Sequence, residues 1–190
     1  MPATAPLHRL HLDIDARVAA VRDGRPDWPC AKGCDHCCRS LADMPRLTPP
    51  EWALLREGLA GLPAAALDAI GRRIAALAAA PSAPLTCPLL DAASGACPVY
   101  PQRPVACRSY GFYVQRERGL YCGEIEAGVA AGGLDDVVWG NHDAIDRSLA
   151  ALGAARTLAE WFVEWVAEAS APSAAAPAAR SGEGGARRRE

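Results

Sequence analysis

The sequence predicts a mainly α-helical fold in which helices pack around an irregular, cysteine-rich lobe with a small β-hairpin. Apolar residues recur at steps of three and four on both sides of the lobe, as one buried face of a helix requires. Between them, residues 81–123 are rich in Pro, Gly, Cys and Tyr and lack this repeat. A chain of 190 residues buries roughly 70% of the surface that its unfolded form exposes, so covalent cross-links are not needed for folding.

Three helices are predicted in the first 80 residues. The first ends near Gly24 and Pro26, the second begins at the capping box Thr48-Pro49-Pro50-Glu51, and the third runs from Pro63 to Pro81. Their apolar positions are Leu7, Leu10, Ile14, Val18 and Val21 in the first helix, Trp52, Leu55 and Leu59 in the second, and Leu67, Ile70, Ile74 and Leu77 in the third.

Beyond the third helix, Cys87–Asp91 and Ala96–Tyr100 flank a short turn and predict either a small hairpin or a pair of extended loops. A fourth helix is expected over Val137–Leu152 around Asn141 as its N-cap, and a fifth after the capping box that joins Thr157 to Glu160. We therefore expect one domain over residues 1–170, with its cysteine-rich lobe at residues 28–123. Residues 171–190 have low complexity and are expected to form a disordered tail.

Composition and charge exclude several classes of partner. The net charge of -2 argues against binding nucleic acid by bulk electrostatics. The mean hydropathy is -0.01 and no apolar run reaches about 18 residues, which argues against a membrane span. The first twelve residues do not resemble a secretory signal. We expect a cytoplasmic protein without a nucleic-acid or membrane partner, and no protein partner is indicated.

Eight cysteines form the outstanding feature of the chain. In a reducing compartment, clustered cysteines are more typical of metal binding or catalysis than of disulfides, although an oxidising compartment would favour disulfides. Thiolates are soft ligands that suit zinc, copper(I) and iron–sulfur clusters. We therefore predict that all eight are metal ligands, namely Cys30, Cys34, Cys37, Cys38, Cys87, Cys97, Cys107 and Cys122.

The first four cysteines lie within residues 30–38, close enough for two or three thiols to meet at one ion. Cys37 and Cys38 are adjacent, and neighbouring side chains usually point apart. This predicts either two metal centres or one thiol that is not a ligand. His36 is either a further ligand of a mixed Cys/His site or an ordinary surface histidine.

The last four cysteines are far apart in sequence and require loops folded back over a shared site. Proline follows both Cys87 and Cys97 and stiffens these loops. Arg39, Arg103 and Arg108 lie beside cysteines in sequence and are candidates to offset thiolate charge, as are Lys32 and the backbone amides near Gly33. Arg103 is expected either to face the metal or to pair with Asp91.

Three sequence blocks carry a resemblance to a known family. They are CAKGCDHCC at residues 30–38, CPLLD at residues 87–91 and CPVYPQRPVACR at residues 97–108. In this order they resemble the YkgJ-type cysteine-cluster family of zinc- or iron-chelating domains. The resemblance covers roughly residues 28–122 and implies chelation of zinc or iron, in metal binding, storage or redox chemistry. Between zinc and an iron–sulfur cluster, we slightly favour the cluster.

Whether the chain is an enzyme is left open by the sequence. A related cysteine cluster occurs in flagellin lysine methylase, which keeps a redox or methyl-transfer enzyme as the alternative. The spacing Cys30-x3-Cys34-x2-Cys37 also resembles that of radical S-adenosylmethionine enzymes. Their strand–helix barrel is not predicted here, and no glycine-rich strand-to-helix turn for a methyl donor is visible. No catalytic or organic-cofactor-binding residue is therefore predicted.

Overall fold

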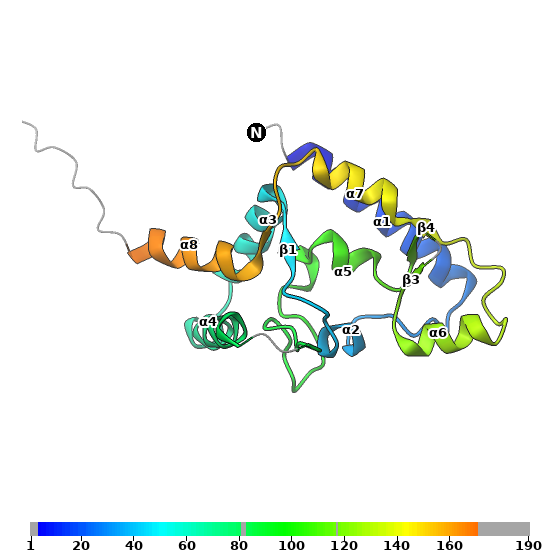
Figure 1. The fold of residues 1–190 in the computed structure, drawn as a ribbon, viewed down its shortest axis with the longest axis horizontal. Coiled ribbons are helices and arrows are strands. Elements are labelled where there is room, and N and C mark those ends of the chain that lie inside the picture. The colour runs from blue at the N-terminus through cyan, green and yellow to red at the C-terminus, as the bar shows by residue number, and fades with distance from the viewer. Residues whose placement is uncertain (1–3, 81–82, 117, 171–190) are drawn as a thin grey trace, which may run out of the picture.

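The chain was analysed as a computed structural model, which describes residues 4–80, 83–116 and 118–170 (Figure 1). The predicted tail at residues 171–190 lies outside this part of the chain.

The prediction of a mainly helical fold is confirmed. The helices are α1 (Thr4–Gly24), α2 (His36–Arg39), α3 (Pro49–Ala60), α4 (Ala64–Ala79), α5 (Val105–Ser109), α6 (Gly123–Ala130), α7 (His142–Ala150) and α8 (Leu158–Ser170), with a 3-10 turn η1 (Tyr100–Gln102). The strands are β1 (Arg46–Leu47), β2 (Tyr113–Gln115), β3 (Arg118–Leu120), β4 (Gly140–Asn141) and β5 (Arg156–Thr157).

The helices bury their apolar stripes in two separate hydrophobic cores. The first core joins α3, α4 and α8, and its fully buried members are Leu47, Leu55, Leu59, Ile70, Ile74, Val99 and Leu158. The second core joins α1, α5, α6 and α7, and includes Leu7, Ile14, Val105, Phe112, Ile125 and Ile145. Figure 1 shows α1 and α7 side by side at one end of the molecule and α4 and α8 at the other. In α1, α3 and α4 the buried stripe is the one predicted from its three- and four-residue spacing, whereas the short helices α5 and α6 were not predicted.

Local signals in the sequence set most of the helix ends. Asn141 caps α7, because its side-chain oxygen accepts a hydrogen bond from the Asp143 backbone nitrogen at 2.9 Å. The helix therefore begins at His142, and Val137 belongs to the preceding turn. None of the helices in the described ranges combines the length and the apolar character needed to cross a membrane.

The small hairpin lies elsewhere than expected. Between Cys87 and Tyr100 only one antiparallel bridge forms, from Asp91 to Ala96, because the prolines in both arms lack the N–H groups that a ladder needs. The hairpin with a regular ladder is β2–β3, where Tyr113 pairs with Leu120. Strand β4 joins β2 in parallel, and β1 pairs with β5 in a second, two-stranded sheet.

The capping residue Glu51 also ties α3 to α5. Its side chain is buried, and it accepts hydrogen bonds from the Thr48 backbone nitrogen at 2.9 Å and the Thr48 hydroxyl at 2.7 Å. Its other carboxylate oxygen accepts from the backbone nitrogen of Val105, the first residue of α5, at 3.0 Å. This contact fixes the start of the helix that carries Cys107.

We expect Glu51→Ala to lower the free energy of unfolding by about 2–4 kcal/mol, because it leaves two backbone N–H groups buried without a partner. Glu160→Ala is the matched control, since Glu160 makes the same capping contacts with Thr157 but is exposed, and it is expected to cost about 1 kcal/mol or less. Urea unfolding of both variants measures the difference. Equal losses would show that the link from Glu51 to α5 adds nothing.

Candidate metal centre

Seven of the eight cysteines line one cavity between the two cores. The cavity has a volume of about 380 Å³, and its thiol-bearing residues are Cys30, Cys34, Cys37, Cys38, Cys87, Cys97 and Cys107. Apolar side chains from both cores complete the wall, among them Leu55 of α3 and Phe112. The helices on either side of the lobe therefore meet at the thiols.

The first cysteine segment is held against the second core. Trp28 is buried there, where its ring stacks on Phe112 with centroids 5.8 Å apart. The Arg22 guanidinium donates a hydrogen bond to the Cys30 carbonyl at 2.6 Å. The Cys34 backbone nitrogen then bonds to the Ala31 carbonyl at 3.1 Å, which turns the chain into the short helix α2 with Cys37 and Cys38.

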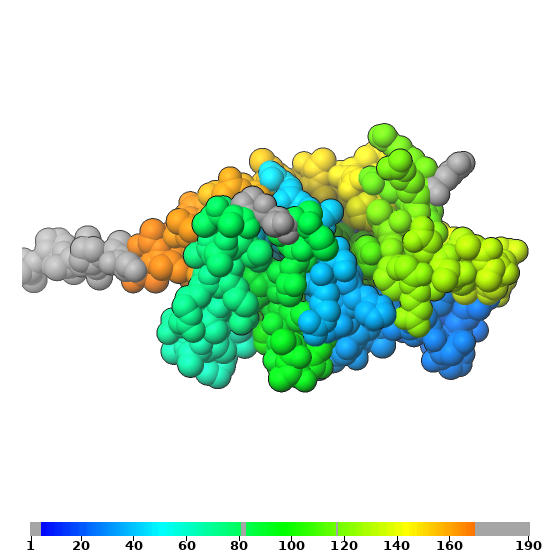
Figure 2. All heavy atoms as spheres, turned by 60° about the horizontal axis from the view of Figure 1, so that its bottom comes forward, coloured from blue at the N-terminus to red at the C-terminus, as the bar shows by residue number. Residues whose placement is uncertain are grey.

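The second group of cysteines is joined to the first through the backbone. Leu41 and Leu85 form an antiparallel bridge, and the Cys87 backbone nitrogen donates to the Cys38 carbonyl at 2.6 Å. Cys87 and Cys97 pack against the first core, whereas Cys107 reaches the cavity from α5. In Figure 2 the light-blue α2 segment lies between the green proline-rich loops and the yellow-green α6.

The electrostatic contacts divide the thiols into two groups. Cys30 interacts with Cys34, Cys37 and Cys122. The Cys38 thiol interacts with the other group, which includes Cys87 and Cys97. Cys107 interacts with Cys37, Cys38 and Cys97, and the Cys37 and Cys38 thiols also contact each other, so the two groups are continuous. Whether the cysteines form one metal centre or two stays a prediction.

Burial and neighbouring thiols raise the pKa of five cavity thiols, which favours their protonated form. Burial is the main cause that raises the pKa of Cys30 to about 11 and that of Cys107 to about 12. Contact with the Cys38 thiol, followed by burial, raises the pKa of Cys37. For Cys38, the contact with Cys37 lowers the pKa, but Cys87 and burial outweigh it and raise the pKa to about 12. Burial also raises the pKa of Cys97.

Arg103 faces the thiols and does not pair with Asp91. Its guanidinium lies 3.4 Å from the centroid of the Tyr100 ring, and its Nε donates to the Tyr100 carbonyl at 3.0 Å. Its charge acts to lower the pKa of Cys37, Cys97 and Cys107, against the larger effects of burial and neighbouring thiols. Asp91 instead accepts hydrogen bonds within its own turn, from the Ser94 hydroxyl at 2.7 Å and the Ala93 nitrogen at 3.0 Å.

Two further arginines border the cavity. Arg108 donates to the Arg103 carbonyl at 3.0 Å and forms an ion pair with Asp15 at 3.2 Å, and Arg22 lies on the same wall. Arg108 thus borders the cavity, but its charge is paired with Asp15, and its predicted role in offsetting thiolate charge stays a prediction. Arg22 and Asp15 come from α1 and were not singled out from the sequence. Arg39 pairs with Asp35 at 2.6 Å and is exposed.

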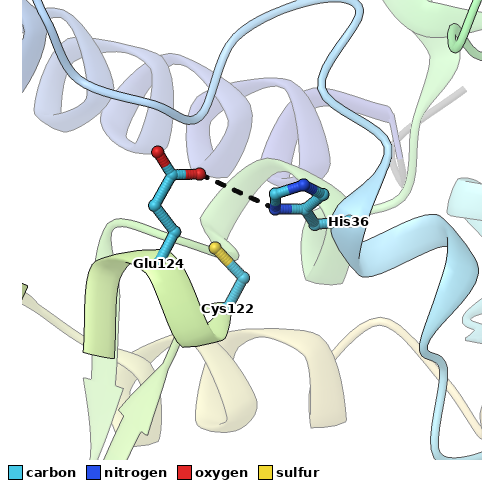
Figure 3. A group of neighbouring side chains, drawn as sticks. All are labelled: His36, Cys122 and Glu124. Carbon is cyan, nitrogen blue, oxygen red and sulfur yellow. Dashed lines mark ion pairs between the residues drawn. The ribbon is translucent and has the colours of Figure 1, made fainter. Parts of the chain in front are cut away.

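Cys122 does not line the cavity, although its thiol interacts with that of Cys30. It is the N-cap residue of α6 and makes no side-chain capping hydrogen bond. Its nearest potential ligands are His36 and Glu124, and the donor atoms of all three lie within 4.8 Å of one another (Figure 3). Glu124 was not singled out from the sequence, although the spacing Cys122-x-Glu124 at a helix start was available as a signal.

The fold and the thiol-lined cavity together define a cysteine-rich metal-binding domain. A family model described as "Putative zinc- or iron-chelating domain" (CxxCxxCC) matches residues 29–124. The chain belongs to this family, which confirms the family predicted from the three cysteine blocks. Comparisons with curated proteins and with solved structures gave no significant match.

Gly111 makes room for the first cysteine. It has φ of +87°, and a Cβ atom there would lie 3.0 Å from the Cys30 Sγ. We expect Gly111→Ala to cost about 1–2 kcal/mol in backbone strain and to displace the Cys30 thiol, reducing metal content as well. Gly132→Ala is the control, since Gly132 has φ of +71° and only an ordinary contact at 3.6 Å. Metal analysis and urea unfolding should show strain in both variants but metal loss only in Gly111→Ala.

Proposed function

We propose that this protein holds iron as an iron–sulfur cluster on the thiols of the central cavity, with a role in metal storage or redox chemistry. The cavity provides more thiols than the four that a cluster of either common type requires. Its apolar wall limits access of water, and Arg103 and Arg22 offset part of the negative charge of a thiolate-bound cluster. Which thiols share a cluster, and whether Cys122 joins them, stays a prediction.

The spacing of the thiols supports a cluster over a single zinc ion. Tetrahedral zinc with Zn–S bonds of about 2.3 Å brings its sulfur atoms to about 3.8 Å from one another. Within the described ranges, no three cysteine sulfur atoms lie within 4.8 Å of one another. A cluster contains several iron and sulfide atoms and therefore holds its thiolates further apart than one ion does. Seven thiols on the wall of one cavity, more than a single zinc ion can bind, are the observation that carries the proposal.

Anaerobic purification followed by metal and acid-labile sulfide analysis tests it. A brown protein with iron and sulfide in comparable amounts supports the cluster. Stoichiometric zinc without sulfide would overturn the proposal of an iron–sulfur cluster but would still support metal chelation by thiolates. Paired, oxidised thiols without metal would overturn both, and thiol counting with and without a reductant separates that result from simple metal loss.

A radical S-adenosylmethionine enzyme is disfavoured by the fold. The strands of the described residues form one two-stranded and one three-stranded sheet, and the segment after Cys37 and Cys38 continues into α3 and α4. Such an enzyme needs repeated strand–helix units to hold its cofactor over the cluster. A redox or methyl-transfer enzyme is the second candidate function. It is favoured by the charged groups on the cavity wall, which provide polar contacts beside the thiols and are Asp15, Arg22 and Arg103.

Zinc serves as a probe of how many thiols bind one ion. Because the pKa values of Cys30, Cys38 and Cys107 lie at about 11 to 12, these thiols are protonated between pH 6 and 8. Each thiol that ligates must release its proton, so raising the pH strengthens binding. We expect about one proton to be released for each thiolate that ligates zinc at the cavity, measured by titration in weakly buffered solution. Release of fewer than two would contradict a thiolate site.

A further inference from the structure

We infer that His36, Cys122 and Glu124 form a second metal site, open to solvent and separate from the cavity, for a divalent transition-metal ion of the zinc type. Figure 3 shows the three side chains directed toward one another, with His36 at the start of α2 and the other two at the start of α6. Among the described His, Cys, Asp and Glu residues, this is the group of three whose donor atoms lie within 4.8 Å of one another. The inference does not rest on the nature of the centre in the cavity.

The donor set matches zinc chemistry. It offers one sulfur, one nitrogen and one carboxylate oxygen, and zinc is bound in proteins by just these three ligand types. Calcium and magnesium prefer all-oxygen ligands and are disfavoured by the thiol and the imidazole. A thiolate and a carboxylate neutralise the two positive charges of the ion. The complex is therefore neutral, which suits a site at the protein surface.

A simple ion pair explains this arrangement less well. The His36 Nδ1 and the Glu124 carboxylate are 3.7 Å apart, which is too long for a hydrogen bond, and both side chains are more than half exposed. An exposed pair of this kind contributes little to stability. An ion pair also gives no reason for the third donor, the Cys122 thiol, which makes no capping contact with α6. A shared ion explains why all three donors converge.

Three protein ligands leave a fourth position of a tetrahedral ion open. Structural zinc sites use four protein ligands, whereas exchange and catalytic sites keep one position for water or an incoming ligand. His36 is adjacent to Cys37, which lies on the cavity wall. An ion bound at this surface site therefore lies beside residues 30–38, which carry four of the cavity thiols. There it is accessible to small chelators.

The test uses the full-length, reduced, metal-free protein titrated with zinc in competition with a colorimetric chelator. We expect Cys122→Ser and His36→Ala each to weaken the affinity for one of the bound zinc ions by more than about 100-fold. This exceeds the 10–100-fold effect that is typical of losing an outer-sphere partner. Glu126→Gln, on the exposed face of the same helix, is the control and should leave zinc binding unchanged. Circular dichroism verifies that each variant is folded.

Cobalt provides the second readout, because replacing Cys122 should remove a thiolate-to-metal charge-transfer band from the most weakly bound equivalent only. The inference is overturned if Cys122→Ser and His36→Ala leave zinc stoichiometry and affinity unchanged. It is also overturned if Cys122→Ser removes the tightly bound metal, since Cys122 would then belong to the inner centre. Cys107→Ser empties the cavity but should leave the surface equivalent in place, so failure of the proposed cluster is distinguishable from failure of this site.

Discussion

Replacing Cys107 with serine is expected to remove the metal of the central cavity and to lower the free energy of unfolding by about 3–5 kcal/mol. Cys107 enters the cavity from α5 and interacts with Cys37, Cys38 and Cys97, which lie on both cysteine segments. A serine hydroxyl is a poor ligand for zinc or for the iron of a cluster, both of which prefer thiolate. Because metal binding is coupled to folding, loss of the ligand destabilises the protein as a whole.

The chain offers a matched control for this substitution. Cys122→Ser makes the same chemical change at a residue outside the cavity wall and should retain the inner metal. Metal analysis after gel filtration compares the metal content of the two variants. Urea unfolding with and without a chelator compares their free energies of unfolding. With chelator present, the difference in stability between wild type and Cys107→Ser should nearly vanish. If Cys107→Ser keeps its metal and its stability, α5 does not supply a ligand.

The helices were predictable because their signals are local. The capping box at Thr48 and Glu51 and the N-cap at Asn141 each act within one helical turn, and they start the helices where expected. Of the two alternatives for residues 87–100, paired loops with one bridge form and a hairpin ladder does not, because the proline of each Cys-Pro step cannot donate to a ladder. The true position of the hairpin at Tyr113–Leu120 depends on packing against the second core and on pairing with β4, which no short window contains.

The site was predictable in its chemistry but not in its arrangement. Eight cysteines identify thiolate chelation by type, yet the contacts that assemble the cavity join residues far apart in sequence, such as Cys38 with Cys87. Cys122 has the same side chain as the others, but its place at the start of α6 puts it beside His36 and Glu124. Spacing alone placed it with Cys87, Cys97 and Cys107 at a shared site and gave no pointer to Glu124.

The position of the cavity between two cores explains why the metal should matter for the fold. Cys87 and Cys97 pack against the first core, whereas Cys30 packs against the second. Direct helix contacts between the two cores are few and come mainly from α1 against α3. A metal centre that binds thiols from both sides therefore acts as a cross-link between them.

Removal of the metal is accordingly expected to loosen the two cores relative to each other before either core unfolds. If metal binding contributes about 5 kcal/mol, at most half of what zinc-finger peptides gain, the melting temperature should fall by about 10–20 °C for a chain of this size. Hydrogen exchange should accelerate most in residues 30–38 and 87–107, and least in α4 and α8, whose apolar faces pack on each other within the first core. Re-addition of metal under anaerobic, reducing conditions should restore the original exchange pattern.

Uniform acceleration of exchange across all helices would contradict this picture, because it would mean that the two cores unfold as one unit. Unchanged exchange in residues 30–38 would contradict it in the opposite way, since the cysteine segments would then be held by their backbone contacts alone. The bridge between Leu41 and Leu85 and the hydrogen bond from Cys87 to Cys38 connect these segments without metal. Further contacts that need no metal join the two cores, namely α1 against α3 and the hydrogen bond from the Val105 backbone nitrogen to Glu51. The metal is therefore expected to add to these contacts by cross-linking the half-buried cavity thiols.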